Sequence, residues 1–255
     1  IKEAIKIAES DGHFRARNMA CYLLGAHYTL IGDMQTSLTY RRLHYQLYVD
    51  DPEQKSRWRK TFIRVLNNYI NGLFLIGDWQ NARKMISNFQ DAETTSPDEE
   101  RELKIRETMT LLILWSKFPE SFEHDQFDEV FRLWTEKEAF VQHLDAPSAW
   151  YYISWIFFNR SDLDKALQHL SNIEQREKVA PLYKQEADNL FALIHLLEED
   201  FEFAESFLVN KRRRKEAFSH DDDLGEGVYK FLHQWSKKMK KPDASELLDH
   251  FESAG

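Results

Sequence analysis

The stretch YTLIGDMQTS, residues 28 to 37, returns with few changes as LFLIGDWQNA, residues 73 to 82. Each Gly-Asp pair separates two segments whose apolar residues have helical spacing, so we place Asp33 and Asp78 in turns between helices. Glycine suits the left-handed position just after a helix, and aspartate caps the helix that follows. A chain that repeats this turn is expected to fold as consecutive helical hairpins.

A phosphate-binding glycine loop is the alternative interpretation of the same stretch. The sequence contains neither GxxxxGK[ST] nor GxGxxG, and the segment before each Gly-Asp pair is helical rather than strand-like in its pattern. We therefore interpret the repeated turn as part of a scaffold.

The same pattern returns at three further aspartates, Asp125, Asp162 and Asp200. The successive intervals of 45, 47, 37 and 38 residues suit stacked helix pairs. The residue four positions after the aspartate is small in four of five copies, with Glu129 as the exception. The residue eight positions after it is apolar in four of five, with Arg41 as the exception. This phase predicts a second helix that packs closely on the first.

The first copy resembles the tetratricopeptide repeat family at its large-small, aromatic, turn and small-residue positions, which are Leu24-Gly25, Tyr28, Gly32-Asp33 and Ser37. The third copy departs from the family pattern, because Pro119 interrupts its first helix and Glu129 replaces the small residue. The consensus tryptophan and terminal proline are absent from every copy.

The resemblance implies an all-α, right-handed α-solenoid of about five stacked helix-turn-helix units within one domain, residues 1-255. The expected units are approximately residues 14-50, 57-92, 99-144, 147-177 and 181-218, with a C-terminal capping helix at 225-252. The segment from Asp188 to Trp235 is also similar to the C-terminal part of Bacteroidetes repeat-containing proteins of unknown function. That second similarity implies no activity.

Composition narrows the range of partners. A net charge of −9 and a pI near 5.6 argue against direct nucleic-acid binding, which requires a basic surface. No apolar run approaches the ~18 residues of a membrane-spanning helix. The single cysteine, Cys21, fits a reducing, cytoplasmic compartment, and its apolar neighbours predict a buried structural thiol.

Ten histidines invite a search for metal ligands, but none forms an HExxH or HxH motif. We interpret His195 as a packed core histidine. His220 with Asp221 to Asp223 is a cluster that could hold a cation, yet it lacks the spacing of a calcium loop. We therefore expect no metal, no cofactor and no catalytic activity.

Two basic runs, residues 211-215 and 237-241, stand out against the acidic background. Both follow helical segments, where cations complement the helix dipole in solvent. If they converge in space, they would form a patch for an acidic partner.

The resemblance also implies that first helices line a concave groove. Counting back from each turn aspartate places asparagines at four groove positions, although asparagine is a poor helix former. One explanation is recognition, because a carboxamide can donate to and accept from a peptide backbone at once. The alternative explanation is that each asparagine forms a hydrogen bond to a neighbouring helix. Arginine would bind an acidic group, and aromatic side chains would form apolar walls. The predicted binding residues are Tyr22, Arg64, Asn67, Asn71, Tyr151, Trp155, Asn159 and Asn189.

The leading expectation is a non-catalytic scaffold that binds a peptide or protein segment in this groove, with a homodimer as a further possibility. One alternative is the sensor domain of a bacterial regulator whose DNA-binding part lies upstream of Ile1. A second is a metal-dependent hydrolase that uses the histidine and aspartates near residue 220.

Overall fold

The computed structural model describes residues 1–9, 13–89, 94, 96–143, 145–174 and 181–213. These residues form thirteen α-helices and two short 3-10 helices, with no strand among them. The all-α prediction is confirmed for this part of the chain. The helices fall into two compact units, residues 1–127 and 128–255.

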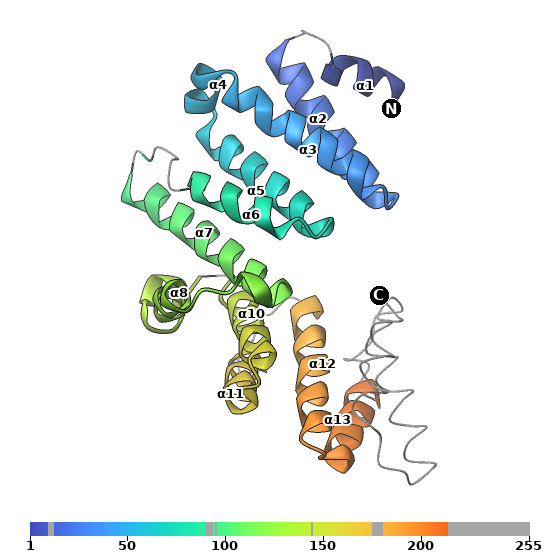
Figure 1. Cartoon of the computed structure of the whole chain (residues 1–255), viewed down its shortest axis with the longest axis vertical. Helices are drawn as coiled ribbons and strands as arrows, with labels where there is room; N and C mark the ends of the chain where they lie inside the picture. Colours follow the sequence, from blue (N-terminus) through green and yellow to red (C-terminus); the bar gives the residue numbers. More distant parts are fainter. Residues whose placement is uncertain (10–12, 90–93, 95, 144, 175–180, 214–255) are drawn as a thin grey trace. The chain divides into compact units, whose positions relative to one another are not determined.

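The first unit contains seven α-helices, two 3-10 helices and the beginning of an eighth α-helix. They are α1 (Lys2–Glu9), α2 (Phe14–Leu30), α3 (Met34–Val49), α4 (Pro52–Arg57), α5 (Arg59–Leu75), α6 (Trp79–Ile86), η1 (Ser87–Phe89), α7 (Pro97–Lys117), η2 (Pro119–Ser121) and α8 (His124–Glu136). In Figure 1, α3, α5, α6 and α7 lie one after another, and α2 packs on α3, α3 on α5 and α5 on α7.

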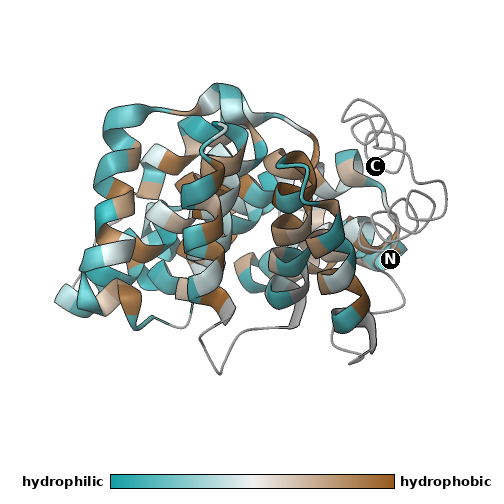
Figure 2. Ribbon diagram, turned by 90° about the horizontal axis from the view of Figure 1, so that it is seen from below, coloured by the Kyte–Doolittle hydropathy of each residue, from teal (hydrophilic) through white to brown (hydrophobic). Residues whose placement is uncertain are grey.

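The second unit holds the rest of α8 and five more helices. They are α9 (Glu138–Val141), α10 (Ala146–Asn159), α11 (Leu163–Glu174), α12 (Pro181–Leu197) and α13 (Phe201–Arg213). Here α10 packs on α11 and on α12, and α12 packs on α13. Hydrophobic and hydrophilic positions alternate along most helices of Figure 2, as expected for helices with one buried face.

The two quoted turns have the predicted geometry. Gly32 and Gly77 have φ values of 80° and 75°, in the left-handed region that glycine tolerates. Asp33 caps α3 by accepting from the backbone N–H of Thr36, and Asp78 caps α6 in the same way. The residues expected to separate two helices therefore do so.

The turns of the second unit reach the same geometry without glycine. Ser161 (φ 59°) precedes Asp162, and Glu199 (φ 64°) precedes Asp200. The backbone N–H of each aspartate donates to the carbonyl five residues earlier, to Phe157 at 3.0 Å and to His195 at 2.8 Å. This bond closes a Schellman-type turn whatever side chain occupies the left-handed position.

The turn that the sequence predicts at Asp125 lies two residues earlier in the structure, at Glu123. Asp125 lies inside α8, and Glu129 is exposed rather than packed on the preceding helix. Glu123 holds the position that an aspartate holds in the other turns. Its backbone carbonyl accepts from the N–H of buried Phe127, four residues later, as the carbonyl of Asp33 accepts from the N–H of Ser37. Pro119 does not interrupt α7, which ends at Lys117; it begins the 3-10 turn that follows.

Arg41, the charged exception at the eighth position, packs between three helices. Hypothetical Cβ atoms on Gly25 of α2 and Gly72 of α5 would lie 3.2 Å from its Cγ and 2.8 Å from its Cδ. Its Nη1 donates to the Asn68 carbonyl at 2.7 Å. Nε and Nη2 donate to the hydroxyls of Ser37 (3.1 Å) and Thr29 (3.0 Å). Partial burial lowers the pKa of Arg41. Arg41 thus joins α2, α3 and α5.

Helix starts and the cysteine follow the sequence patterns. Ser96 caps α7 with Pro97 in its first turn, and Pro147 and Pro181 lie in the first turns of α10 and α12. Cys21 is fully buried, and burial raises the pKa of its thiol to about 11. The capping helix at 225–252 lies outside the described residues. A single right-handed solenoid of five units remains a prediction.

Candidate functional site

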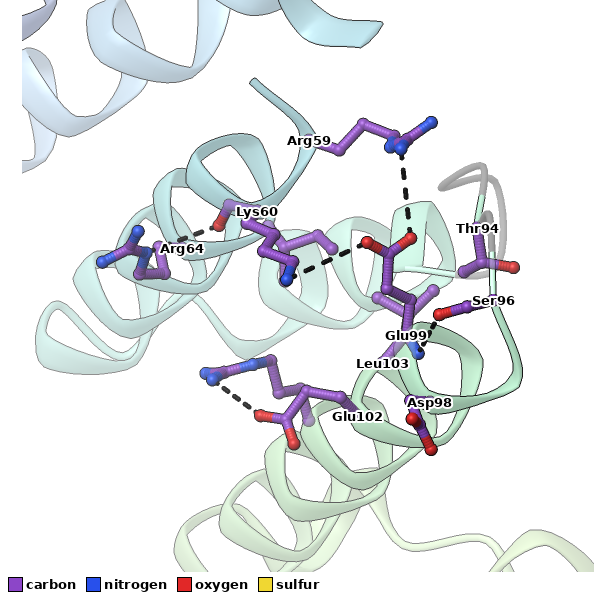
Figure 3. Close-up of a pocket in the computed structure, with 11 residues that line it drawn as sticks. Arg59, Lys60, Arg64, Thr94, Ser96, Asp98, Glu99, Glu102 and Leu103 are labelled. Atoms are coloured by element: carbon purple, nitrogen blue, oxygen red, sulfur yellow. Dashed lines mark hydrogen bonds and ion pairs between the residues drawn. The ribbon is translucent and has the colours of Figure 1, made fainter. Parts of the chain in front are cut away.

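A groove of about 540 Å³ lies between the N-terminal halves of α5 and α7 in the first unit (Figure 3). Eleven residues line it: Arg59, Lys60, Ile63, Arg64, Thr94, Ser96, Asp98, Glu99, Glu102, Leu103 and Arg106. A hollow with few apolar and many charged side chains suits a polar ligand or a polar segment of a protein.

The α5 wall is basic from its first residue. Trp58 precedes α5 and makes no side-chain capping hydrogen bond, and the first turn contains no acidic residue. Arg59 and Lys60 instead stand in that first turn, where cations are unfavourable beside the positive end of the helix dipole. Arg64 lies one turn further along the same wall. This end of α5 therefore concentrates positive potential.

The α7 wall supplies the opposite charge. Ser96 accepts from the N–H of Glu99 at 3.2 Å, which fixes the first turn of α7. Asp98, Glu99 and Glu100 follow, as is favourable at a helix N-terminus. Three carboxylates, on Asp98, Glu99 and Glu102, thus line the groove opposite the α5 cations.

The ion pairs across the groove are long. One oxygen of Glu99 lies 4.0 Å from Arg59 Nη2, and its other oxygen lies 4.0 Å from Lys60 Nζ. Within α7, Arg106 pairs with Glu102 at 2.9 Å. The Lys60 side chain is 79% exposed, and an exposed ion pair at 4.0 Å contributes little, so a bound segment could compete with Glu99 for Lys60 at small cost.

Arg64 has no carboxylate within 4 Å of its guanidinium among the described residues. Its Nε donates only weakly, to the Lys60 carbonyl at 3.4 Å, and the side chain is exposed. Figure 3 shows it on the same helix as Lys60, at the edge of the groove. Its guanidinium can accept a new anionic partner without breaking an ion pair.

Asn67 and Asn71 continue the line of Arg64 along α5, at steps of three and four residues that keep them on one helix face. Both are half-buried. The hydroxyl of Thr110 on α7 donates to the Oδ1 of Asn67 at 3.5 Å, so this face looks toward α7. For Asn67 this is the hydrogen bond to a neighbouring helix that the alternative interpretation predicts. The structure therefore places three of the eight predicted binding residues on one face of α5, and of these three Arg64 lines the groove while Asn67 and Asn71 lie beyond its lining.

Tyr22 lies apart from them, on α2. Its ring is about half exposed, and its edge contacts His44 of α3 with the ring centroids 6.4 Å apart. It does not line the α5–α7 groove.

The other four predicted residues lie in the second unit, where burial limits two of them. Tyr151 is only 9% exposed, and its ring packs against those of Tyr152 and Tyr183. Burial, together with Glu186, raises the pKa of Tyr151 far above its usual value. Asn189 is buried too. These two side chains offer little surface to a ligand.

Trp155 and Asn159 are more accessible. Trp155 is half-buried on α10, and its ring meets that of Phe158 edge to face at 5.2 Å. Asn159 is the exposed last residue of the same helix. They share α10 but lie one turn apart.

Sequence reasoning missed most of the groove, notably Arg59, Lys60 and Arg106. The irregular third copy prevented any projection onto α7, and the connection before it, with Thr94, carried no helical pattern. Two cations in the first turn of α5, against the helix dipole, were the one local signal available.

The remaining predicted sites are placed as follows. Across the described residues, no three His, Cys, Asp or Glu side chains lie close enough together to hold a metal ion. His195 packs between the rings of Phe191 (4.7 Å) and Phe203 (4.5 Å), as expected for a core histidine. The cluster at 220–223 and the basic run at 237–241 lie outside the described residues, as do the side chains of 211–215.

Two further findings concern membrane-spanning helices and similarity to known proteins. In the part of the chain that the structure describes, no helix is both long and apolar enough to cross a membrane. No family model matches the chain, and no similar curated protein or solved structure was found. The resemblance to tetratricopeptide repeats therefore depends on the sequence patterns alone.

Proposed function

We propose that this protein is a non-catalytic scaffold whose α5–α7 groove binds a peptide or protein segment. The observation that carries the proposal is the exposed Arg64 guanidinium, which has no carboxylate partner among the described residues, in line with two asparagines on the same helix face. Arg64 would pair with an acidic group, and Asn67 and Asn71 would hydrogen-bond the backbone of the bound segment.

Two further features support this proposal. The groove holds room for a few side chains, and Ile63 and Leu103 give it apolar contact area among the charged residues. The Lys60 side chain is 79% exposed and lies 4.0 Å from Glu99, so Lys60 can pair with a second acidic group. The bound segment is therefore expected to be acidic, with small or apolar residues between its charges.

The test begins with selection of binding peptides from a random display library on the intact protein, followed by affinity measurement by fluorescence anisotropy. Arg64→Ala should weaken binding about tenfold, because a charge-assisted hydrogen bond contributes roughly 1.5–3 kcal/mol. Asn67→Ala combined with Asn71→Ala should weaken binding about thirtyfold, through two neutral hydrogen bonds of about 1 kcal/mol each.

Exposed residues away from the groove serve as matched controls: Arg42→Ala on α3 and Asn210→Ala on α13. These variants should bind as the unchanged protein does. Selected peptides that bind all four variants equally well would contradict a binding role for the groove, as would a library that yields no binder.

A further inference from the structure

The helix α2 has two apolar faces. One is buried in the first unit through Ala20, Cys21, Leu24 and Gly25. The opposite face carries five more apolar residues, which we call the α2 seam: Ala16, Met19, Leu23, Ala26 and Leu30. Met19, Leu23 and Leu30 are 55%, 53% and 86% exposed. A long apolar stripe in solvent is unfavourable unless another surface covers it.

The seam has the spacing of a helix-helix contact. Its residues follow one another at steps of three, four, three and four, which is the heptad pattern of apolar positions in paired helices. The residues of the buried face occupy other positions of the heptad, so the seam is not a by-product of packing inside the unit. This spacing favours a helix as the covering partner.

The order of small and large residues along the α2 seam indicates which helix covers it. Ala16 and Leu30 lie seven residues on either side of Leu23, while Met19 and Ala26 lie four before and three after it. A two-fold axis at Leu23 therefore sets each alanine of one copy against a large residue of another. We infer that α2 is a dimer contact, which pairs antiparallel with α2 of a second copy about an axis at Leu23.

A parallel arrangement fits less well. It would set Ala16 against Ala16 and Ala26 against Ala26 and leave gaps between the helices at both places. The antiparallel arrangement fills them by alternating small and large side chains.

Charge favours the same arrangement. Arg15, exposed near the N-terminus of α2, would lie beside the C-terminal end of the other α2, where exposed Asp33 follows. Cations stabilise a helix C-terminus, and antiparallel helix dipoles attract each other. The helix α2 contains no Asp or Glu, so no carboxylates oppose each other along the seam. The contact uses no residue that lines the α5–α7 groove, so it is independent of the proposed function.

One helix pair of this length gives a small interface. The seam spans fourteen residue steps between Ala16 and Leu30, about four helical turns or 21 Å at 1.5 Å per residue. Such a contact lies at the weak end of stable interfaces. We expect a reversible dimer with a dissociation constant in the micromolar range.

Sedimentation equilibrium of the intact chain, from about 1 to about 100 μM, tests the inference. The protein should shift from monomer to dimer, and Leu23→Asp should weaken dimerisation by more than about tenfold, because two carboxylates would meet at the axis. Leu75→Asp is the matched control, since Leu75 is an exposed leucine (47%) on α5. Circular dichroism confirms that both variants keep their helices. A monomer at every concentration, or a dimer that Leu23→Asp leaves unchanged, overturns the inference.

Disulfide trapping tests the direction of the pair. Under mild oxidation Leu23→Cys should cross-link to itself, whereas Met19→Cys should cross-link only when it is mixed with Ala26→Cys. The natural Cys21 is buried and serves as the background measured in the unchanged protein. Efficient self-cross-linking of Met19→Cys would show a parallel pair and contradict the antiparallel arrangement.

Discussion

The helix pairs α2–α3 and α10–α11 are built on the same turn with different residues. In the first pair, glycine occupies the left-handed position, and Arg41 fills the space eight residues after the aspartate with hydrogen bonds. In the other pair, Ser161 adopts the left-handed conformation, and Leu170 fills the corresponding space with apolar contact. Backbone hydrogen bonding and capping therefore fix the hairpin, while its interior accepts either polar or apolar packing.

The two pairs should differ most in their response to acid. His44 of α3 lies in a buried site with its Nε2 2.7 Å from Asn18 Oδ1, and burial lowers its pKa to about 4. Between pH 6.5 and 4 the unfolded chain binds a proton there that the folded chain does not, so stability falls as the pH falls. The loss should be roughly 3 kcal/mol. Urea unfolding measured across this range, with His44→Gln as the comparison, should show it.

His169 of α11 is the corresponding control. Burial lowers its pKa as well, and its ring stacks on Phe157 with the centroids 5.5 Å apart. We expect His169→Gln to change the acid response less than His44→Gln does. A larger change would assign most of the acid sensitivity to the second unit, and an equal change would mean that the two pairs do not differ in their response to acid.

Replacing Arg41 of the α2–α3 pair by leucine, the residue at the corresponding position of the α10–α11 pair, should reduce the free energy of unfolding by a smaller amount. Arg41→Leu removes the donor to the Asn68 carbonyl and to two hydroxyls in a partly buried space, and we expect a loss of about 2 kcal/mol in the free energy of unfolding. Chemical denaturation measures it. A stability change within about 0.5 kcal/mol would mean that apolar packing replaces the Arg41 hydrogen bonds without loss.

Exchanging the residues at the left-handed position, Gly32 and Ser161, should change the free energy of unfolding least, and with opposite sign in the two helix pairs. Gly32→Ser should destabilise the protein by about 1 kcal/mol, because a Cβ is unfavourable in this conformation. Ser161→Gly should stabilise it by about 0.5 kcal/mol, since relief of strain exceeds the added entropy of the unfolded chain. Thermal and urea unfolding of both variants check the signs. Two changes of the same sign would show that the turns differ in more than this residue.

The local part of the fold could be predicted from sequence, because its determinants lie within a few residues of each other. Gly32 with Asp33, and Ser96 with Pro97, are read from short patterns and occupy the expected positions. The third turn was misplaced because its backbone role falls to Glu123, while the nearest aspartate lies two residues later inside α8. The side-chain pattern locates the turns at Asp33, Asp78, Asp162 and Asp200, and it fails where a glutamate holds the corresponding position.

The site was predictable only along one helix. Arg64, Asn67 and Asn71 share a face of α5 through their spacing, which the sequence contains. The opposite wall of the groove depends on how α7 packs after an irregular connection, and no spacing encodes that. Tyr151 was chosen by register, but the rings of Tyr152 and Tyr183 cover it, and that contact joins residues about thirty positions apart.

The position of Arg41 also bears on how the chain opens. Helical repeats in a row can in general unfold one after another, because each contacts only its neighbours. A guanidinium that bonds to groups of α2, α3 and α5 at once removes that independence, since neither hairpin can separate without breaking its hydrogen bonds. We therefore expect the first two hairpins to open together rather than one after the other.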